Sequence, residues 1–176
     1  IDACAGAGGK SLHLAALMKN KGKIISMDVE AHKLEELKKR AKRAGAFNVE
    51  TRCIEDNKTV KKLEGKADKV LLDVPCSGSG VIKRNPDAKW KLSEDGIQKT
   101  KNLQQKIFNE YAIMVKPGGS LFYTTCSILP SENREQVDAF LKLNTNFTFV
   151  NEKTILPSEG YDGFYMCELI HNPVIS

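Results

Sequence analysis

Short apolar runs alternate with helix-like segments along the chain, and this alternation restricts the fold more than any other feature. The strand-like runs lie at residues 23–28, 48–54, 68–73 and 120–126. Helical spacing of apolar residues covers residues 32–45 and 95–115, and a further helix is expected to begin at Ser131, with Glu132 in its first turn. Such repetition predicts a doubly wound, Rossmann-like α/β sheet with helices on both faces.

The end of the chain departs from this parallel pattern. Residues 147–150 and 162–170 read as an antiparallel pair of strands, and the KPGG sequence at 116–119 is expected to break the long preceding helix. The predicted sheet is therefore mostly parallel, with an antiparallel pair of strands near the C-terminus.

Several chemically active side chains stand at or just past the carboxyl ends of the predicted strands. They are Cys4, Asp28, Asp73, Cys76 and Cys126. In open α/β sheets, ligands bind in the crevice outside these strand ends. We therefore expect residues that are far apart in sequence to meet at one edge of the sheet.

The glycine-rich turn DACAGAGGKS, at residues 2–11, resembles a phosphate-binding loop at first sight. A P-loop ending in Gly-Lys-Ser would need its first glycine at position 4, where Cys4 stands. A dinucleotide fingerprint would need its third glycine at position 11, where Ser11 stands. Both phosphate-binding interpretations fail on spacing.

The same turn suits an amino-acid-bearing nucleoside. Glycines at positions 6, 8 and 9 allow close backbone approach, and N–H groups at the start of the next helix can hold a carboxylate. Asp28, at the end of the following strand, is placed to accept hydrogen bonds from a ribose diol. A carboxylate and a ribose in one crevice describe S-adenosylmethionine (SAM). The alternative is a turn that only packs a helix on a strand.

Two cysteine motifs identify a family. The relevant segments are DACAGAGGKS, DVPCSGSGVIKRNPDAKW, KPGGSLFYTTCS, ENREQV and DGFYMCEL, in this order over nearly the whole chain. The sequence resembles the RNA cytosine-C5 methyltransferases of the Sun/Fmu family, also called the NOL1/NOP2/Sun family. The GVIKRNPDAKW stretch is most similar to the bacterial branch that modifies small-subunit ribosomal RNA.

The resemblance implies covalent catalysis. C5 of cytosine is a poor nucleophile, and a thiolate that adds to C6 makes C5 enamine-like and able to accept a methyl group. The resemblance assigns this nucleophile to Cys126 and assigns help in product release to Cys76. DNA cytosine methyltransferases, by contrast, carry the nucleophile in the Pro-Cys motif.

The resemblance also implies a set of SAM-binding residues. The turn would contribute Cys4, Ala5, Gly6, Ala7, Gly8, Gly9 and Lys10. Asp28 matches the ribose-binding acid, Asp56 the residue near the adenine, and Asp73 an acid shared between the cofactor and the target base. The family usually has proline where Ala7 stands and alanine where Gly6 stands, so this turn is expected to be more flexible.

RNA is the expected partner. A net charge of +5 is a mild indication of a polyanionic ligand. The expected RNA contacts follow the loop that contains Pro75 and Cys76, called the Pro-Cys loop below. They are Lys83, Arg84, Lys89, Trp90 and Lys91. The target base must leave its stack, and Trp90 or Tyr123 either stacks on it or belongs to the core. The basic run at residues 38–43 is expected to be a solvated helix face.

Other features limit the alternatives. The five cysteines are odd in number and form no C-x-x-C pair, which predicts free thiols, no metal site and a cytoplasmic location. No apolar run is long enough to cross a membrane.

We expect a monomer with one catalytic domain over residues 1–176. We also expect an RNA-binding region before this domain, because the chain begins without Met directly on a strand. The alternatives are a non-catalytic RNA-binding protein on a methyltransferase fold and a methyltransferase for small molecules or proteins. Neither requires two cysteines.

Overall fold

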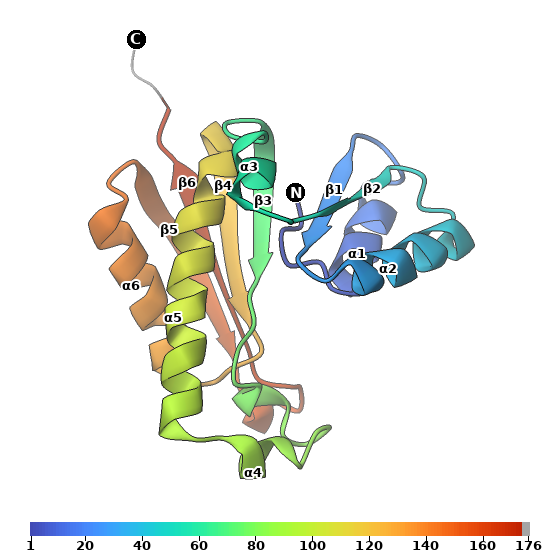
Figure 1. Ribbon diagram of the computed structural model, residues 1–176. Helices are drawn as coiled ribbons and strands as arrows, with labels where there is room; N and C mark the ends of the chain where they lie inside the picture. The colour runs from blue at the N-terminus through green and yellow to red at the C-terminus, as the bar shows by residue number, and fades with distance from the viewer. Residues whose placement is uncertain (174–176) are drawn as a thin grey trace.

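A mixed β-sheet forms the centre of the molecule and helices pack against it (Figure 1). The computed structural model describes residues 1–173, with every side chain among them except that of Lys91. The strands are β1 (Ile24–Asp28), β2 (Val49–Cys53), β3 (Ala67–Asp73), β4 (Val115–Thr125), β5 (Phe147–Ile155) and β6 (Phe164–His171). The α-helices are α1 (Gly9–Leu17), α2 (Ala31–Ala44), α3 (Asn57–Lys61), α4 (Ala88–Lys91), α5 (Glu94–Tyr111) and α6 (Arg134–Leu143). Short 3₁₀ turns occupy η1 (Ser79–Val81), η2 (Ala112–Met114), η3 (Pro130–Glu132) and η4 (Pro157–Glu159).

The strand pairing confirms the predicted fold class. β1 pairs in parallel with β2, and β3 pairs in parallel with β4. The first residues join these two pairs, because the Asp2 N–H donates to the Ile25 carbonyl at 2.9 Å and the Ala3 N–H donates to the Leu71 carbonyl at 2.9 Å. β6 lies antiparallel between β4 and β5. The protein is thus a Rossmann-like sheet, mostly parallel, with an antiparallel pair of strands at its C-terminal edge.

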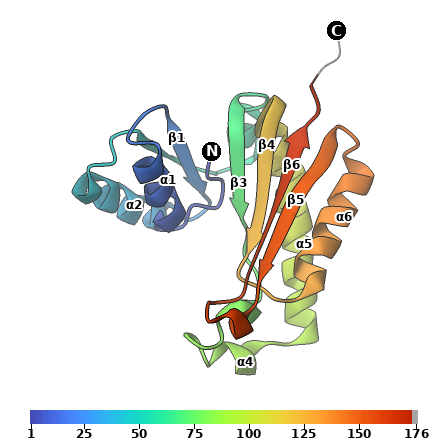
Figure 2. The same ribbon diagram turned by 180° about the vertical axis from the view of Figure 1, so that it is seen from behind.

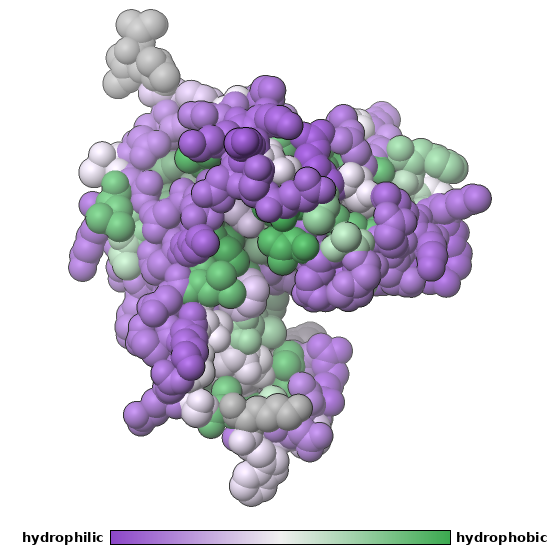
Figure 3. Space-filling model, viewed as in Figure 1, coloured by the Kyte–Doolittle hydropathy of each residue, from purple (hydrophilic) through white to green (hydrophobic). Residues whose placement is uncertain are grey.

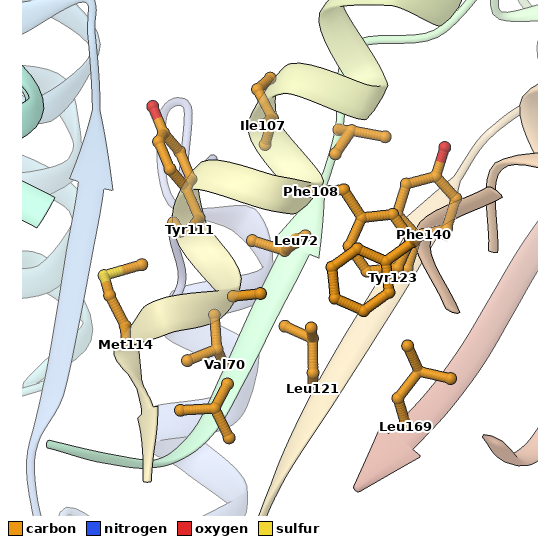
Figure 4. Packing of buried hydrophobic residues seen from close by; sticks show 14 of the residues in the cluster. Val70, Leu72, Ile107, Phe108, Tyr111, Met114, Leu121, Tyr123, Phe140 and Leu169 are labelled. Atoms are coloured by element: carbon orange, nitrogen blue, oxygen red, sulfur yellow. The ribbon is translucent and has the colours of Figure 1, made fainter. Parts of the chain in front are cut away.

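The larger hydrophobic core lies between the sheet and the helices α5 and α6, which cover one face of β3, β4, β6 and β5 (Figures 1 and 2). The Phe108 ring stacks on Tyr123 and on Phe140, with ring centroids 4.6 and 4.0 Å apart (Figure 4). Full burial of each such ring contributes about 2 to 3 kcal/mol. This layer holds β3 and β4, which carry the two cysteine loops, in fixed register.

A smaller core lies under the glycine-rich turn. Leu34, Leu37 and Ala41 lie on one face of α2 at helical spacing and pack with Ala5 of the turn. The turn is therefore fastened to α2 as well as to the sheet.

Two predicted boundaries are wrong. The helix expected over residues 95–115 ends at Tyr111 and is followed by η2, while the KPGG sequence lies inside β4, where the pairing with β3 shifts register. The helix expected to begin at Ser131 begins at Arg134, and Glu132 lies in η3, fully buried. Tertiary contacts override local propensity in both places.

Two kinds of feature are absent from residues 1–173, the part of the chain that the structure describes. No helix in this part combines the length and the apolar character that crossing a bilayer requires. Nor does this part contain a group of three or more His, Cys, Asp or Glu side chains arranged to hold a metal ion.

Candidate active site

A cavity of about 600 Å³ opens at the carboxyl ends of β1, β3 and β4. The space-filling view shows apolar surface gathered in a recess of this face, between the part that carries α2 and the part that carries α4 (Figure 3). The sequence-predicted residues that line the cavity are Cys4, Gly6, Lys10, Asp28, Asp56, Asp73, Cys76 and Cys126. The structure therefore brings together residues that lie more than 100 positions apart in the chain, as the strand-end rule predicts.

The two cysteines meet because their strands are neighbours. Asp73, the last residue of β3, is in register with Thr124 of β4, so the loops that follow both strands leave the sheet side by side. The Sγ atoms of Cys76 and Cys126 lie 3.1 Å apart. The hydrogen bond with Cys76 lowers the pKa of Cys126 to about 7, while that same bond and burial raise the pKa of Cys76. Near neutral pH the arrangement favours a thiolate on Cys126 with Cys76 as its hydrogen-bond donor.

Asp73 is held in place through both carboxylate oxygens. Lys10 Nζ donates to its Oδ2 at 2.5 Å, and Thr124 Oγ1 donates to its Oδ1 at 3.0 Å. The ion pair links the first helix to the strand end beside the cysteines. Sequence reasoning placed Lys10 in the cofactor turn but did not predict this pairing.

The glycine turn is ordered by Asp28. Its Oδ2 accepts the N–H of Gly6 at 2.8 Å, and its Oδ1 accepts the N–H of Glu30 at 2.9 Å. Gly6 and Gly8 have φ angles of 53° and 86°, in the left-handed region that favours glycine. A Cβ at Gly8 would also collide with the side chain of Leu37. Gly8, Gly9, Ala5 and Ala7 do not line the cavity, so their contribution is to shape the turn.

Asp56 both lines the cavity and begins a helix. It is the N-cap of α3, and its Oδ1 accepts the N–H of Thr59 at 3.2 Å. The contact of Asp56 with the adenine, which the family resemblance implies, stays a prediction.

The charge of the cavity distinguishes between ligand classes. Its lining contains the acids Asp28, Glu30, Glu55, Asp56, Asp73 and Glu110. Against these six carboxylates stand three lysines, at positions 10, 33 and 106, which leaves a formal charge of −3. This balance opposes a triphosphate or dinucleotide and favours a ligand that carries positive charge.

The expected RNA contacts form a separate exposed group. Lys83, Arg84, Lys89 and Trp90 are all exposed, and none of them lines the cavity. Arg84 forms an ion pair with Asp162, in the segment before β6, and Lys89 Nζ lies 4.8 Å from the centre of the Trp90 ring. The side chain of Lys91 lies outside the described residues.

The structure decides one open alternative and corrects one expectation. Tyr123 belongs to the core, which was one of the two places left open for it, because it is fully buried against Phe108 and its hydroxyl donates to the backbone carbonyl of Glu132 at 2.7 Å. The basic run at 38–43 is not wholly solvated, since Arg40 is half-buried and donates to the carbonyl of Ala7 in the glycine turn at 2.7 Å.

Sequence reasoning missed one residue beside the cysteine loops. Glu132 accepts hydrogen bonds from Ser77 and Ser127, which directly follow the two cysteines. Its position in the ENREQV motif is the only signal in the sequence, and the local pattern there predicts no more than an acid in the first turn of a helix.

Comparison with known proteins places this arrangement in a family. Residues 1–170 match the family model described as "16S rRNA methyltransferase RsmB/F". The "Probable ribosomal RNA small subunit methyltransferase B" of Bacillus subtilis (strain 168) is 37% identical over 188 residues, covering 96% of this chain and 42% of that protein. The "Ribosomal RNA small subunit methyltransferase B" of Shewanella oneidensis is 37% identical over 182 residues, covering 97% of this chain and 42% of that protein.

Solved structures agree. The crystal structure of PH0851 superposes with a TM-score of 0.91 at 38% identity, over 96% of this chain and 41% of that one. NSun6 from Pyrococcus horikoshii with SFG gives a TM-score of 0.85 at 27% identity, over 97% of this chain and 47% of that one. The chain thus spans less than half the length of these relatives. Its family-model match and its identity with these proteins show that it belongs to the RsmB/F family of 16S rRNA methyltransferases, within the Sun family of the sequence-based expectation.

Proposed function

We propose that this chain is the catalytic part of a SAM-dependent enzyme that methylates C5 of a cytosine in small-subunit ribosomal RNA. The observation that carries the proposal is the pair of thiols 3.1 Å apart at the edge of the acidic cavity, with the more acidic thiol on Cys126. The names of the relatives support ribosomal RNA as the substrate class. Free cysteines and a ribosomal substrate are consistent with a cytoplasmic location.

The cavity suits SAM in size and charge. A volume of about 600 Å³ lies within the usual range for sites that hold ligands of this size. SAM carries a sulfonium and an ammonium, and the six carboxylates of the lining complement these positive charges. Asp28, Val29 and Ile54 line the cavity. We expect Asp28 to bind the ribose diol, and the side chains of Val29 and Ile54 to offer apolar surface for the adenine. Lys10, in the first turn of α1, lines the cavity and suits the carboxylate.

Cys126 performs the covalent step. Its thiolate adds to C6 of the cytosine, and the electron pair of the C5–C6 double bond becomes available at C5. Bound SAM supplies the electrophilic methyl group that C5 takes up. Loss of the C5 proton to a base then restores the double bond and expels Cys126 as a thiolate.

Cys76 and Asp73 assist from the neighbouring loop. The Cys76 thiol, hydrogen-bonded to Cys126, stabilises the departing thiolate and so favours release of the methylated RNA. Asp73 lies on the same cavity and can hydrogen-bond the cytosine ring as its charge distribution changes. The exposed side chains of Lys83, Arg84, Lys89 and Trp90 are candidates for contacts with the RNA around the flipped base.

The direct test is nucleoside analysis after methyl transfer. The protein is incubated with methyl-labelled SAM and an unmodified small-subunit ribosomal RNA transcript, and the RNA is digested to nucleosides. We expect the label in 5-methylcytidine and its loss in the Cys126→Ala variant. Label in another nucleoside, or undiminished 5-methylcytidine with Cys126→Ala, would contradict the proposal.

A further inference from the structure

A single buried carboxylate joins the two cysteine loops. Oε1 of Glu132 accepts the N–H of Ser77 at 2.8 Å and the Nε2–H of Gln104 at 3.1 Å. Oε2 accepts the Ser127 hydroxyl at 2.5 Å and also the Ser77 hydroxyl. Glu132 itself is fully buried in η3. All of these donors are neutral, so four hydrogen bonds compensate the burial of the charge.

The two serine partners of Glu132 are the neighbours of the two cysteines in the sequence. Ser77 directly follows Cys76, and Ser127 directly follows Cys126. One carboxylate therefore holds the chain immediately after each thiol. A buried carboxylate without a cationic partner costs stability relative to an apolar residue, so packing alone does not account for it.

We propose that Glu132 is a positioning residue that fixes the separation and relative orientation of the Cys76 and Cys126 thiols. The proposal rests on the function proposed above for these cysteines. The loops are also joined by the Gly80 N–H, which donates to the Cys126 carbonyl at 2.9 Å, and by the Ser79 and Ser127 hydroxyls, whose oxygens lie 2.9 Å apart. Without the Glu132 bridge these contacts remain, but the residues that directly follow the two thiols lose their shared anchor and the hydrogen bond between the thiols weakens. The thiolate fraction of Cys126 near neutral pH then falls, because that hydrogen bond is the main cause of its lowered pKa.

The turn that carries Glu132 has its own anchors. Tyr123 donates to the Glu132 backbone carbonyl at 2.7 Å, and the Asn133 amide donates to the Ser127 carbonyl at 2.9 Å. Thr125 Oγ1 donates to Asn133 Oδ1 at 2.6 Å. These bonds do not involve the Glu132 carboxylate, so a change of that side chain alone leaves the turn attached.

The test measures how the alkylation rate of Cys126 by iodoacetamide depends on pH, with the modified peptide identified by mass spectrometry. In the unchanged protein, we expect the alkylation rate of Cys126 to reach half its maximum at a pH near 7, called the midpoint below. In Glu132→Ala we expect a higher midpoint and an about tenfold slower reaction at pH 7. Glu132→Gln keeps a polar bridge of the same length, so it should restore most of the rate. Glu135→Ala, which removes an exposed acid three residues along the chain, is the matched control and should behave as the unchanged protein.

A second measurement separates positioning from a general structural effect. If Glu132 acts through Cys76, then Glu132→Ala should change the Cys126 midpoint little in a Cys76→Ala background. A further shift of equal size in that background, or an unchanged midpoint in a folded Glu132→Ala protein, would overturn the proposal. Where Glu132→Ala does not fold, the Cys126 midpoints of Glu132→Gln, Glu132→Asp and the unchanged protein are compared instead. Identical midpoints for all three proteins would overturn the positioning proposal.

The readout needs neither RNA nor SAM, which keeps the two proposals distinguishable. A midpoint that shifts in a protein without cytosine methylation supports the positioning role and counts against the proposed function. In a protein that does methylate cytosine, we expect Glu132→Ala to lower kcat about tenfold with little change in KM for SAM. An altered KM with unchanged kcat would contradict the positioning role.

Discussion

The Sγ atoms of Cys76 and Cys126 lie 3.1 Å apart, although 50 positions separate the two residues in the sequence. The parallel pairing of β3 with β4 brings the loops together, and their hydrogen bond makes the two thiols unequal. One is favoured as a thiolate and the other as its donor. The proposed division of labour between nucleophile and release residue follows from this inequality.

Removing the donor should change the acidity of the nucleophile. The pKa of Cys126 is lowered to about 7 chiefly by Cys76, so Cys76→Ala should raise it toward the ordinary thiol value. Because only the thiolate is nucleophilic, reactivity that normally rises with pH through about 7 should then require a higher pH. Iodoacetamide labelling of Cys126 at pH 7 should slow about tenfold. Cys76→Ser keeps a donor and should slow it less; an equal effect of Ala and Ser would contradict this reasoning.

Two substitutions separate the two roles of Asp56, as N-cap of α3 and as a carboxylate of the cavity. Asp56→Ser keeps the N-cap of α3, because serine also accepts the Thr59 N–H, but removes the carboxylate from the cavity. We expect stability within about 0.5 kcal/mol of the unchanged protein, whereas Asp56→Ala should lose about 1 kcal/mol. SAM affinity, measured by calorimetry, should fall about tenfold in both variants. Full affinity in Asp56→Ser would show that the carboxylate does not contact the cofactor.

Gly80 is a point of close backbone contact beside the nucleophile. Its N–H donates to the Cys126 carbonyl at 2.9 Å, and its carbonyl accepts the Gly163 N–H at 2.7 Å. A Cβ at position 80 would meet the Gly163 carbonyl and would lie 2.7 Å from the Cys126 carbonyl oxygen. Since these are backbone atoms, Gly80→Ala should lower the free energy of unfolding by about 1 to 3 kcal/mol and displace Cys126. Denaturant unfolding checks the first effect and the labelling rate of Cys126 the second; a fully stable, fully reactive variant would refute both.

The basic residues after the Pro-Cys loop should act through phosphates. Lys83→Ala and Lys89→Ala should each weaken binding to a ribosomal RNA transcript, and each should reduce the salt dependence of the binding constant by about 0.7 to 0.9 for every phosphate that is no longer neutralised. Lys42→Ala, which removes an exposed lysine from α2, is the matched control and should leave that slope unchanged. Equal slopes for all three variants would place the RNA elsewhere.

Much of this fold follows from local sequence patterns. The apolar runs of β1 and β3 and the glycines of the turn act over a few residues, so they are readable without the structure. The reactive side chains stand at the carboxyl ends of the strands, and the sheet topology brings these ends together at one edge. Cys126, Cys76, Asp73 and Asp28 could be placed together for this reason.

The parts that sequence reasoning missed depend on distant partners. Glu132 resembles an exposed helix-start acid until the core buries it and Ser77 and Ser127 surround it. Tyr123 could equally have faced a base, and only its packing against Phe108 shows that it does not. The pairing of Lys10 with Asp73 likewise joins residues 63 positions apart.

Covalent trapping tests the central claim most directly. A small-subunit ribosomal RNA transcript that contains 5-azacytidine is incubated with the protein and SAM, and adducts that survive denaturation are mapped by peptide mass spectrometry. We predict a bond at Cys126 that forms normally in the Cys53→Ser control and is lost in Cys126→Ser. An adduct at Cys76, or an undiminished adduct in Cys126→Ser, would contradict the account.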